Sequence, residues 1–356
     1  MLKFILRRML YGIAVLFGVV TLVFLLFNIL PGDPARMMLG QRADQEAVDA
    51  IHKELGLDKP LVVRYFNYLN DLLPLSFYKI DTTSENQFEK YGSTLHIASI
   101  SNTVVLLKMP YLQKSYQSKR TVGAVLLEAF PKTLLLASVS ILFALIIGVL
   151  IGIVAAVVNT PFFNRLVLVI TTIGMSLPSF FAAILMAWIF GFLLESFTGL
   201  NMYGSLYSID EYGHGEYLDL KNLILPAITL GIRPLAIVTE LTRTSLLETL
   251  STDYIRTARA KGLKEVRVIA VHALRNAMNP VVTAVSGWFA SLLAGAVFVE
   301  YVFDWKGIGV VIVDALEKYD FPVIMGSVLL IAFMLIIINI FVDIVYGLLD
   351  PRIRLT

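Results

Sequence analysis

Six long apolar runs, separated by polar stretches, constrain the fold of this chain more than any other feature. Each run is close to the roughly 20 residues that a helix needs to cross about 30 Å of hydrocarbon. Backbone amides find no water inside a bilayer, so such runs must be helical. We therefore predict an all-α polytopic membrane protein. Its predicted spans are residues 9–30, 133–158, 166–194, 222–242, 281–298 and 322–349.

The composition supports a membrane protein and offers no site for metal or covalent chemistry. Of the 356 residues, 57% are apolar and 16% are charged, against about 45–50% and 25% in soluble domains. Cysteine is absent, and the four histidines are scattered without metal-ligand spacing. No catalytic constellation and no GxxxxGK[ST] loop occurs. We expect no catalytic residue, metal or cofactor in this chain, so any ATP and Mg²⁺ would bind to other subunits.

The polar segment between the fourth and fifth runs, residues 251–280, is strongly basic. It carries six Lys or Arg side chains, with only Asp253 and Glu265 as acids. Basic loops stay on the cytoplasmic side of a membrane. The other basic residues near predicted inner ends agree, which places both termini in the cytoplasm. These residues are Lys3, Arg7, Arg8, Arg165, Arg352 and Arg354.

The same segment has the pattern of two short amphipathic helices. Ser251 and Thr252 are typical N-cap residues, and Gly262 followed by Leu263 is typical of a helix C-terminus. A second helix follows, and Pro280 is expected to close the segment. Such helices either lie on lipid or on their own bundle, or form a docking surface for a soluble partner. The apolar face expected for the second helix comprises Val266, Ile269, Ala270, Ala273 and Ala277.

Residues 31–131 are predicted to lie on the extracytoplasmic side, as a small domain or as a loose lid. Residues 43–55 and 62–73 have helical patterns, whereas 95–97 and 103–106 are strand-like. The chain therefore divides into residues 1–30, which hold the first span, residues 31–131, and a five-helix core at 132–356 that contains the basic segment.

Charged residues and helix breakers inside the predicted spans are few. Arg233 and Glu240 lie in the fourth span, where they either pair near an interface or line a polar translocation path. We expect Gly174 and Pro178 to kink the third span, Pro226 and Pro234 to break the fourth, and Pro131 to lie in the first turn of the second. In the fifth span, a stripe of small residues favours close helix packing; it comprises Gly287, Ser291 and Gly295.

The chain contains four motifs whose order along the sequence resembles that in the permease subunits of bacterial ABC importers for dipeptides and oligopeptides. This branch also includes nickel and glutathione importers. The central motif is Asp253–Leu263, followed by residues 272–277, which is similar to the "EAA" loop of these permeases. The others are residues 6–10 with 30–34, residues 302–309, and residues 349–354. The resemblance covers most of the chain.

The resemblance implies a type I importer permease fold whose cytoplasmic loop contacts separate ATPase subunits. It implies three kinds of partner: a second, homologous permease, two ATPase subunits and an extracytoplasmic substrate-binding protein. Membrane lipid would surround the chain in a bacterial inner membrane. No nucleic-acid partner is expected. The residues implied to couple transport to the ATPase are Arg256, Thr257, Ala258, Arg259, Ala260, Lys261, Gly262 and Leu263.

The chain departs from the pattern of this branch in several places. Arg256 and Thr257 stand where the general motif has Glu and Ala, and Lys306 where the branch often has proline. Residues 74–109 form an insertion that weakens any substrate assignment. Peptides, a nickel chelate and glutathione therefore remain open as cargo. The alternative class is a channel or secondary transporter that works without an ATPase.

Overall fold

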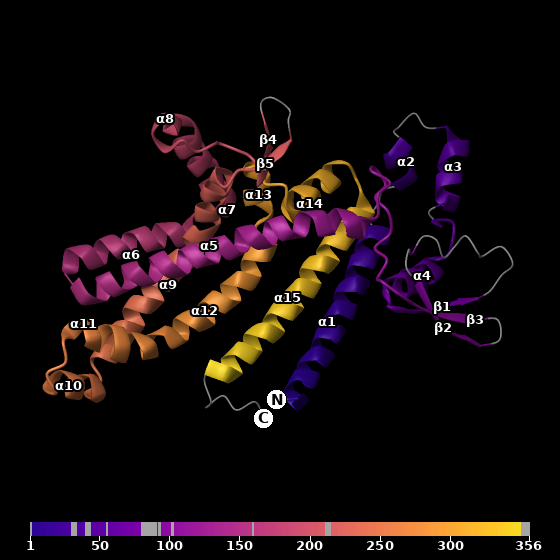
Figure 1. Ribbon diagram of the computed structural model, residues 1–356. Helices are drawn as coiled ribbons and strands as arrows, with labels where there is room; N and C mark the ends of the chain where they lie inside the picture. Colours follow the sequence, from indigo (N-terminus) through magenta and orange to yellow (C-terminus); the bar gives the residue numbers. More distant parts are fainter. Residues whose placement is uncertain are drawn as a thin grey trace. The chain divides into compact units, whose positions relative to one another are not determined.

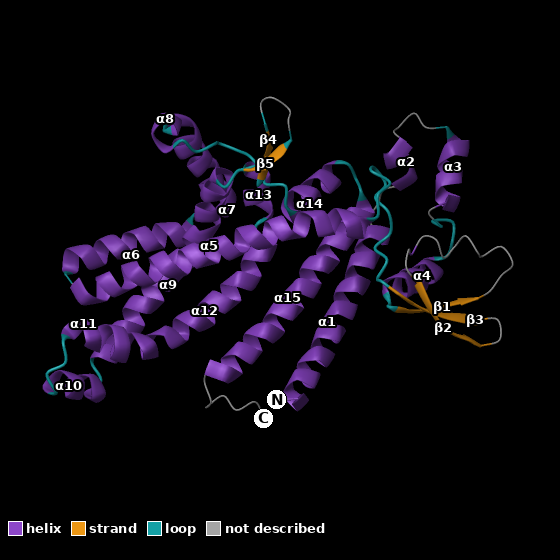
Figure 2. Cartoon of the chain, viewed as in Figure 1, coloured by secondary structure: helices purple, strands orange, loops and turns teal. Residues whose placement is uncertain are grey.

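The computed structural model is mainly helical (Figures 1 and 2). Two compact units are present: residues 1–10, 129–310 and 333–356 form the first, and residues 11–128 and 311–332 form the second. Helices α1 (Leu2–Ile29), α5 (Val122–Val158), α14 (Ile308–Glu317) and α15 (Phe321–Leu349) have residues in both units. The structure describes residues 2–29, 34–39, 44–54, 56–79, 91, 94–100, 103–158, 160–210 and 215–349.

Five helices in the described residues are long and apolar enough to cross a membrane, and a bent pair supplies a sixth span. All five single helices are longer than the predicted spans, and α12 both begins and ends before its predicted span. The six predicted spans are thus confirmed by length and composition. The helices are α1 (Leu2–Ile29), α5 (Val122–Val158), α9 (Lys221–Leu250), α12 (Leu274–Gly295), α15 (Phe321–Leu349) and the pair α6 (Pro161–Ser176) with α7 (Ser179–Met186) and η3 (Ala187–Leu193).

The bent pair confirms the break predicted at Pro178. Helices α6 and α7–η3 meet at 108°. Leu177 adopts an extended conformation (φ −69°, ψ 128°), because a residue before proline disfavours the helical region. The kink expected at Gly174 is not seen. That glycine lies buried inside α6, where an added Cβ would meet the Ile232 side chain of α9 at 3.2 Å.

The other prolines do not break their helices, which corrects four sequence-based expectations. Pro131 lies inside α5 rather than in its first turn, Pro226 and Pro234 lie inside α9, and Pro280 lies inside α12. An interior proline removes one backbone hydrogen bond and costs about 3 kcal/mol. Packing offsets that cost in α9, because both of its prolines are buried.

Helix α9 is the buried centre of the first unit, and glycines let α5 approach it closely. A Cβ on Gly152 would lie 2.6 Å from Cβ of Thr242, and one on Gly148 would lie 2.8 Å from the Val238 side chain. On α9 itself, a Cβ on Gly231 would meet the Phe143 ring at 2.9 Å. Close packing therefore occurs at this crossing. On α12, by contrast, nothing lies within 4 Å of a Cβ added to Gly287 or Gly295.

A larger core joins α5, α7, α9 and α12 to the short helix α13 (Val297–Val302). Buried Leu136, Leu230 and Leu292 belong to it, as does Trp305 in the turn after α13. Smaller elements of the first unit complete it. They are α8 (Glu195–Thr198), β4 (Tyr207–Ile209), β5 (Glu216–Leu218), α10 (Asp253–Ala260), α11 (Glu265–Arg267), η4 (Val268–Ala273) and the start of α14 (Ile308–Glu317).

The second unit contains most of the region predicted to be extracytoplasmic. Tyr68 of α4 packs against Phe24 of α1, with ring centroids 5.5 Å apart. Its antiparallel sheet has the order β1-β3-β2, and the strand-like patterns at 95–97 and 103–106 fall within β2 and β3. Its further elements are α2 (Pro34–Leu39), α3 (Gln45–Glu54), α4 (Leu61–Leu72), β1 (Leu75–Lys79), β2 (Thr94–Ile100) and β3 (Thr103–Lys108). Much of motif 30–34 and of the C-terminal motif lies outside the described residues.

Candidate functional site

The basic segment forms two short helices around a left-handed glycine. Helix α10 begins after Thr252, whose hydroxyl donates to the Thr249 carbonyl rather than capping α10. Gly262 has φ +75°. Its N–H donates to the Arg259 carbonyl at 2.9 Å, and the Leu263 N–H donates to the Ala258 carbonyl at 3.4 Å. These two bonds define a Schellman C-cap, as the sequence predicted.

One face of this helical pair packs on its own bundle. Ile255 and Ala258 of α10 and Val268 of η4 are buried against Leu246 of α9 and Ala156 of α5. Burying these side chains anchors the segment to the adjoining ends of α5 and α9, since each large apolar side chain contributes about 1.5–3 kcal/mol. The predicted packing on the protein's own bundle is therefore present on this face, and the opposite face remains available.

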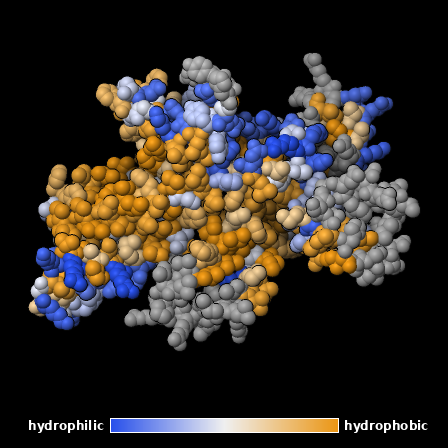
Figure 3. Space-filling model, viewed as in Figure 1, coloured by the Kyte–Doolittle hydropathy of each residue, from blue (hydrophilic) through white to orange (hydrophobic). Residues whose placement is uncertain are grey.

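The opposite face is polar and exposed. Figure 3 shows hydrophilic side chains over α10 and α11, whereas hydrophobic side chains cover α5 and α6. Arg259 forms a bidentate pair with Glu265, through Nε at 3.1 Å and Nη2 at 2.6 Å. This pair ties α10 to α11 across the glycine turn. Six of the eight predicted coupling residues are exposed, namely Arg256, Thr257, Arg259, Ala260, Lys261 and Gly262, whereas Ala258 is buried and Leu263 half-buried.

The prediction of the buried face of the second helix was partly wrong. Val266 is 78% exposed and Ala270 is also exposed, whereas Val268, Ala273 and Ala277 are buried. The reason is η4, a π-helical stretch within an otherwise α-helical run. A π-turn inserts one extra residue and rotates the face that follows, and α-helical spacing in the sequence does not reveal it.

The two charged residues predicted for the pathway have different surroundings. Arg233 is exposed on α9, and its guanidinium lies 5.9 Å from the centre of the Trp288 ring of α12, a cation–π contact. Glu240 instead pairs with Arg243 one turn along α9, at 3.5 Å, and accepts a bond from the Thr244 hydroxyl. The structure therefore supports pairing for Glu240, and it leaves Arg233 facing out of this chain.

A buried carboxyl after the fifth span was missed by the sequence analysis. Glu300 of α13 is fully buried and accepts the Gly309 N–H at 2.6 Å. A Cβ on Gly307 would lie 2.5 Å from both Glu300 carboxyl oxygens. Burial raises the pKa of Glu300 to about 7, although hydrogen bonds from Thr133 and Gly309 oppose the shift. The glycines of motif 302–309 signal this tight turn.

Taken together, the spans and the exposed helical elbow, formed by α10, the Gly262 turn and α11 (residues 253–267), define a polytopic membrane protein with a polar surface beside its spans. A profile described as "Binding-protein-dependent transport system inner membrane component" matches residues 148–355, and its N-terminal companion matches residues 1–78. The chain belongs to this family, the permease subunits of ABC transporters, as the sequence motifs predicted.

Curated relatives match along the whole chain. The di/tripeptide transport system permease protein DppB of Pseudomonas aeruginosa is 37% identical over 99% of each chain. The dipeptide transport system permease protein DppB of Escherichia coli K12 is 35% identical, again over 99% of each. The glutathione transport system permease protein GsiC of Escherichia coli O6:H1 is 36% identical over 99% of each.

A solved structure shows the same fold. An inward-facing MetNI methionine ABC transporter matches with a TM-score of 0.51 at 18% identity, covering 64% of this chain and 97% of that one. The expected ABC permease fold is therefore confirmed. Among the described residues, no group of three His, Asp or Glu side chains is placed to hold a metal ion.

Proposed function

We propose that this chain forms half of the translocation path of an ATP-driven importer for short peptides. The relatives named for di- and tripeptide transport match it from end to end, which supports peptides as cargo. A glutathione permease matches at similar identity. Glutathione is itself a modified tripeptide, so it belongs to the same chemical class. A nickel chelate is the third candidate that the sequence left open, and no relative named here carries it.

The exposed elbow is the surface that we propose to dock on a separate ATPase subunit. Its apolar face is anchored to the bundle, so a push on the exposed face is transmitted to α5 and α9. The Arg259–Glu265 pair and the C-cap at Gly262 make it a rigid lever. This anchored, exposed geometry is the observation that supports the coupling role of residues 256–263.

The pathway and the partner permease are proposed to lie on one side of α9 and α12. Arg233 and Trp288 are in contact there, and the small residues of α12 leave an exposed strip that the chain itself does not cover. A second permease would close this side of the path, and Arg233 would meet a substrate carboxylate. An extracytoplasmic binding protein would deliver the cargo, and both termini would lie in the cytoplasm of a bacterial inner-membrane protein.

Charge reversal at Lys261 tests the coupling role without disturbing the fold. Lys261 is exposed next to the glycine turn. We expect Lys261→Glu to reduce co-purification of the ATPase subunits and peptide-stimulated ATP hydrolysis at least about fivefold, a loss typical of a contact in a charged interface. Lys221→Glu, at the opposite end of α9, serves as control. Peptide uptake by vesicles that contain no ATPase would overturn the proposal and favour a channel or secondary transporter.

A further inference from the structure

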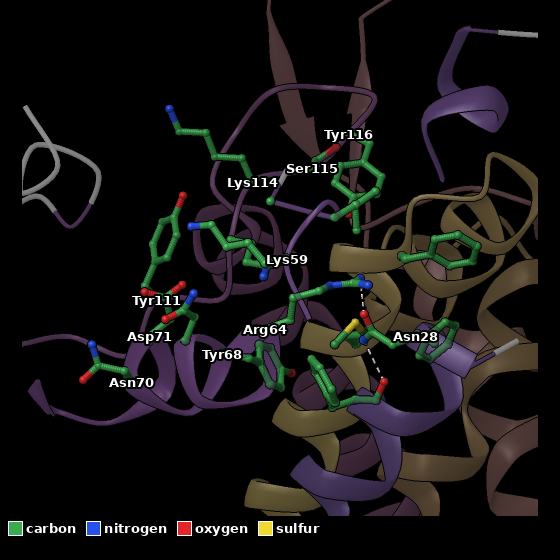
Figure 4. A pocket seen from close by; sticks show the side chains of 18 of the residues that line it. Asn28, Lys59, Arg64, Tyr68, Asn70, Asp71, Tyr111, Lys114, Ser115 and Tyr116 are labelled. Atoms are coloured by element: carbon green, nitrogen blue, oxygen red, sulfur yellow. Dashed lines mark hydrogen bonds between the residues drawn. The ribbon is translucent and has the colours of Figure 1, made fainter. Parts of the chain in front are cut away.

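A cavity of about 640 Å³ lies within the second unit, and neither the elbow nor Arg233 lines it. Its size falls in the range of small-molecule sites. The lining comes from the end of α1, from residues 53–59, from α4, from Tyr78 and Tyr91, from residues 111–119 and from the start of α15 (Figure 4). No part of the proposed transport mechanism uses it.

The cavity is rich in positive charge. Among the described residues, five cations line it, Lys53, Lys59, Arg64, Lys114 and Lys119, and one carboxylate, Asp71. None of the five forms an ion pair with a described residue. Asp71 is engaged on the tyrosine side of the cavity, where it accepts a bond from the Tyr91 hydroxyl at 2.5 Å.

Arg64 is the anchor of the site. It is half-buried, and its guanidinium donates to Oδ1 of Asn28, a neutral acceptor (Figure 4). Asn28 is held in this orientation because its own amide donates to the Phe24 carbonyl at 2.7 Å. Desolvation by burial lowers the pKa of Arg64 below its ordinary value. A guanidinium has five N–H donors, so most of this fork remains unused by the described residues.

A buried carboxylate of the same unit, Asp320, is already hydrogen-bonded. Asp320 accepts the Ser115 hydroxyl at 2.5 Å and the Tyr116 N–H at 3.0 Å. These bonds fold residues 115–117 over the cavity and leave the Asp320 carboxylate committed to that turn. The half-buried Arg64 guanidinium therefore has no carboxylate partner among the described residues, whereas the four lysines of the lining are exposed to solvent.

The position of the cavity relative to the membrane spans indicates which kind of anion would bind to Arg64. Phe24, Phe27 and Asn28 are among the last residues of the first candidate span, and Phe321 and Met325 lie at the beginning of the last one. The cavity thus has apolar walls at one membrane boundary and cations beyond them. Phospholipid headgroups occupy this depth, and their phosphate oxygens match the fork of N–H donors that Arg64 presents.

We propose that this cavity binds the phosphate group of an anionic phospholipid, with Arg64 as the principal contact and Lys59 and Lys114 as flanking cations. In the orientation proposed above, the lipid belongs to the extracytoplasmic leaflet. Its aromatic and apolar walls would receive the glycerol end and the upper acyl chain. The site would fasten α4 to the ends of the first and last spans.

Native mass spectrometry of the purified transporter complex tests this site. Dioleoyl phosphatidylglycerol is titrated against dioleoyl phosphatidylcholine, which has the same chains and no net charge. We expect phosphatidylglycerol to bind at least about tenfold more tightly, and Arg64→Gln to remove most of this preference, since a charged hydrogen bond contributes about 1.5–3 kcal/mol. Lys318→Gln is the matched control, because Lys318 is exposed in the same unit and contacts Asp314 instead.

Further measurements identify the source of the anion and test whether the variants fold. Displacement of phosphatidylglycerol by sn-glycerol 3-phosphate would show that the free headgroup suffices, and no displacement would show that the acyl chains are needed. Thermal unfolding checks the fold of Arg64→Gln, and Lys59→Gln replaces it if that variant does not fold. Equal binding of the two lipids, an equal loss in Lys318→Gln, or displacement by Ala-Ala would overturn the proposal.

Discussion

Single residues decide the two tightest turns of this permease. Gly262 closes α10 with a positive φ, and Gly307 allows the Glu300 carboxyl to pack against the backbone. The two glycines are needed for different reasons. At Gly262 the space is open and only the backbone conformation is demanding, whereas at Gly307 any side chain would collide with Glu300 and Thr133.

The effect of a substitution at Gly262 should depend on how readily the new residue adopts a positive φ, and not on the size of its side chain. A left-handed conformation costs an ordinary L-residue about 1–2 kcal/mol, least for Asn. We expect Gly262→Val to uncouple transport from ATP hydrolysis while the bundle remains folded, and Gly262→Asn to keep most of the activity. Peptide uptake per ATP hydrolysed in proteoliposomes measures the effect. Unaltered uptake by the Val variant would argue against a coupling role.

Glu300 should make stability depend on pH. Its native pKa is raised to about 7 from an ordinary value of 4.5, so the native state binds the proton more tightly than the unfolded state. This stabilisation is complete below about pH 4.5 and is lost as pH rises through about 7.

Replacing the Glu300 carboxyl should remove this dependence of stability on pH. We expect the unfolding temperature of the wild type to fall between pH 5 and 7.5 relative to that of Glu300→Gln, which has no proton to lose in this range. Thermal unfolding in detergent across this range measures it. Glu248→Gln, which removes an exposed carboxylate of α9, is the control. Parallel curves for wild type and Glu300→Gln would contradict the assignment.

Helices in this chain are held by packing more than by local preference. Proline normally ends a helix, yet α9 runs through Pro226 and Pro234 because its neighbours bury it. The crossing of α5 and α9 depends on small residues at the contact, as close helix packing in membranes generally does.

The α5–α9 crossing should not accept even one methyl group. A Cβ at position 152 would lie 2.8 Å from the Thr239 carbonyl oxygen, a backbone atom that cannot rotate away. We expect Gly152→Ala to lower the free energy of unfolding by about 1–3 kcal/mol. Gly123→Ala, where nothing lies within 4 Å, should be neutral or slightly stabilising. Equal stability of the two variants would mean that the helices separate without cost.

The whole chain presents surfaces that it does not cover itself. The small-residue strip of α12 is exposed next to Trp288, and the elbow is exposed where it packs on α5 and α9. Both are expected of one subunit in a larger assembly, because an uncovered strip beside a charged side chain such as Arg233 is poorly suited to lipid.

Bulk on the α12 strip should affect assembly and leave the isolated chain unchanged. We expect Gly287→Leu to keep the unfolding temperature of the single chain within about 2 °C, since its Cβ meets nothing, and to reduce co-purification of the second permease. Val169→Phe adds bulk on the exposed face of α6 and is the control. Normal assembly of Gly287→Leu would place the partner elsewhere.

The six spans, the polar elbow and its glycine C-cap could be predicted from the amino-acid sequence. These features depend on hydrophobic length, on local charge and on the conformation of one residue, all of which are readable along the chain. Only the tertiary structure decided that α9 continues through two prolines, that η4 rotates the second helix, and that Glu300 is buried. Each of these depends on which distant side chains supply the contacts, and no local pattern encodes that.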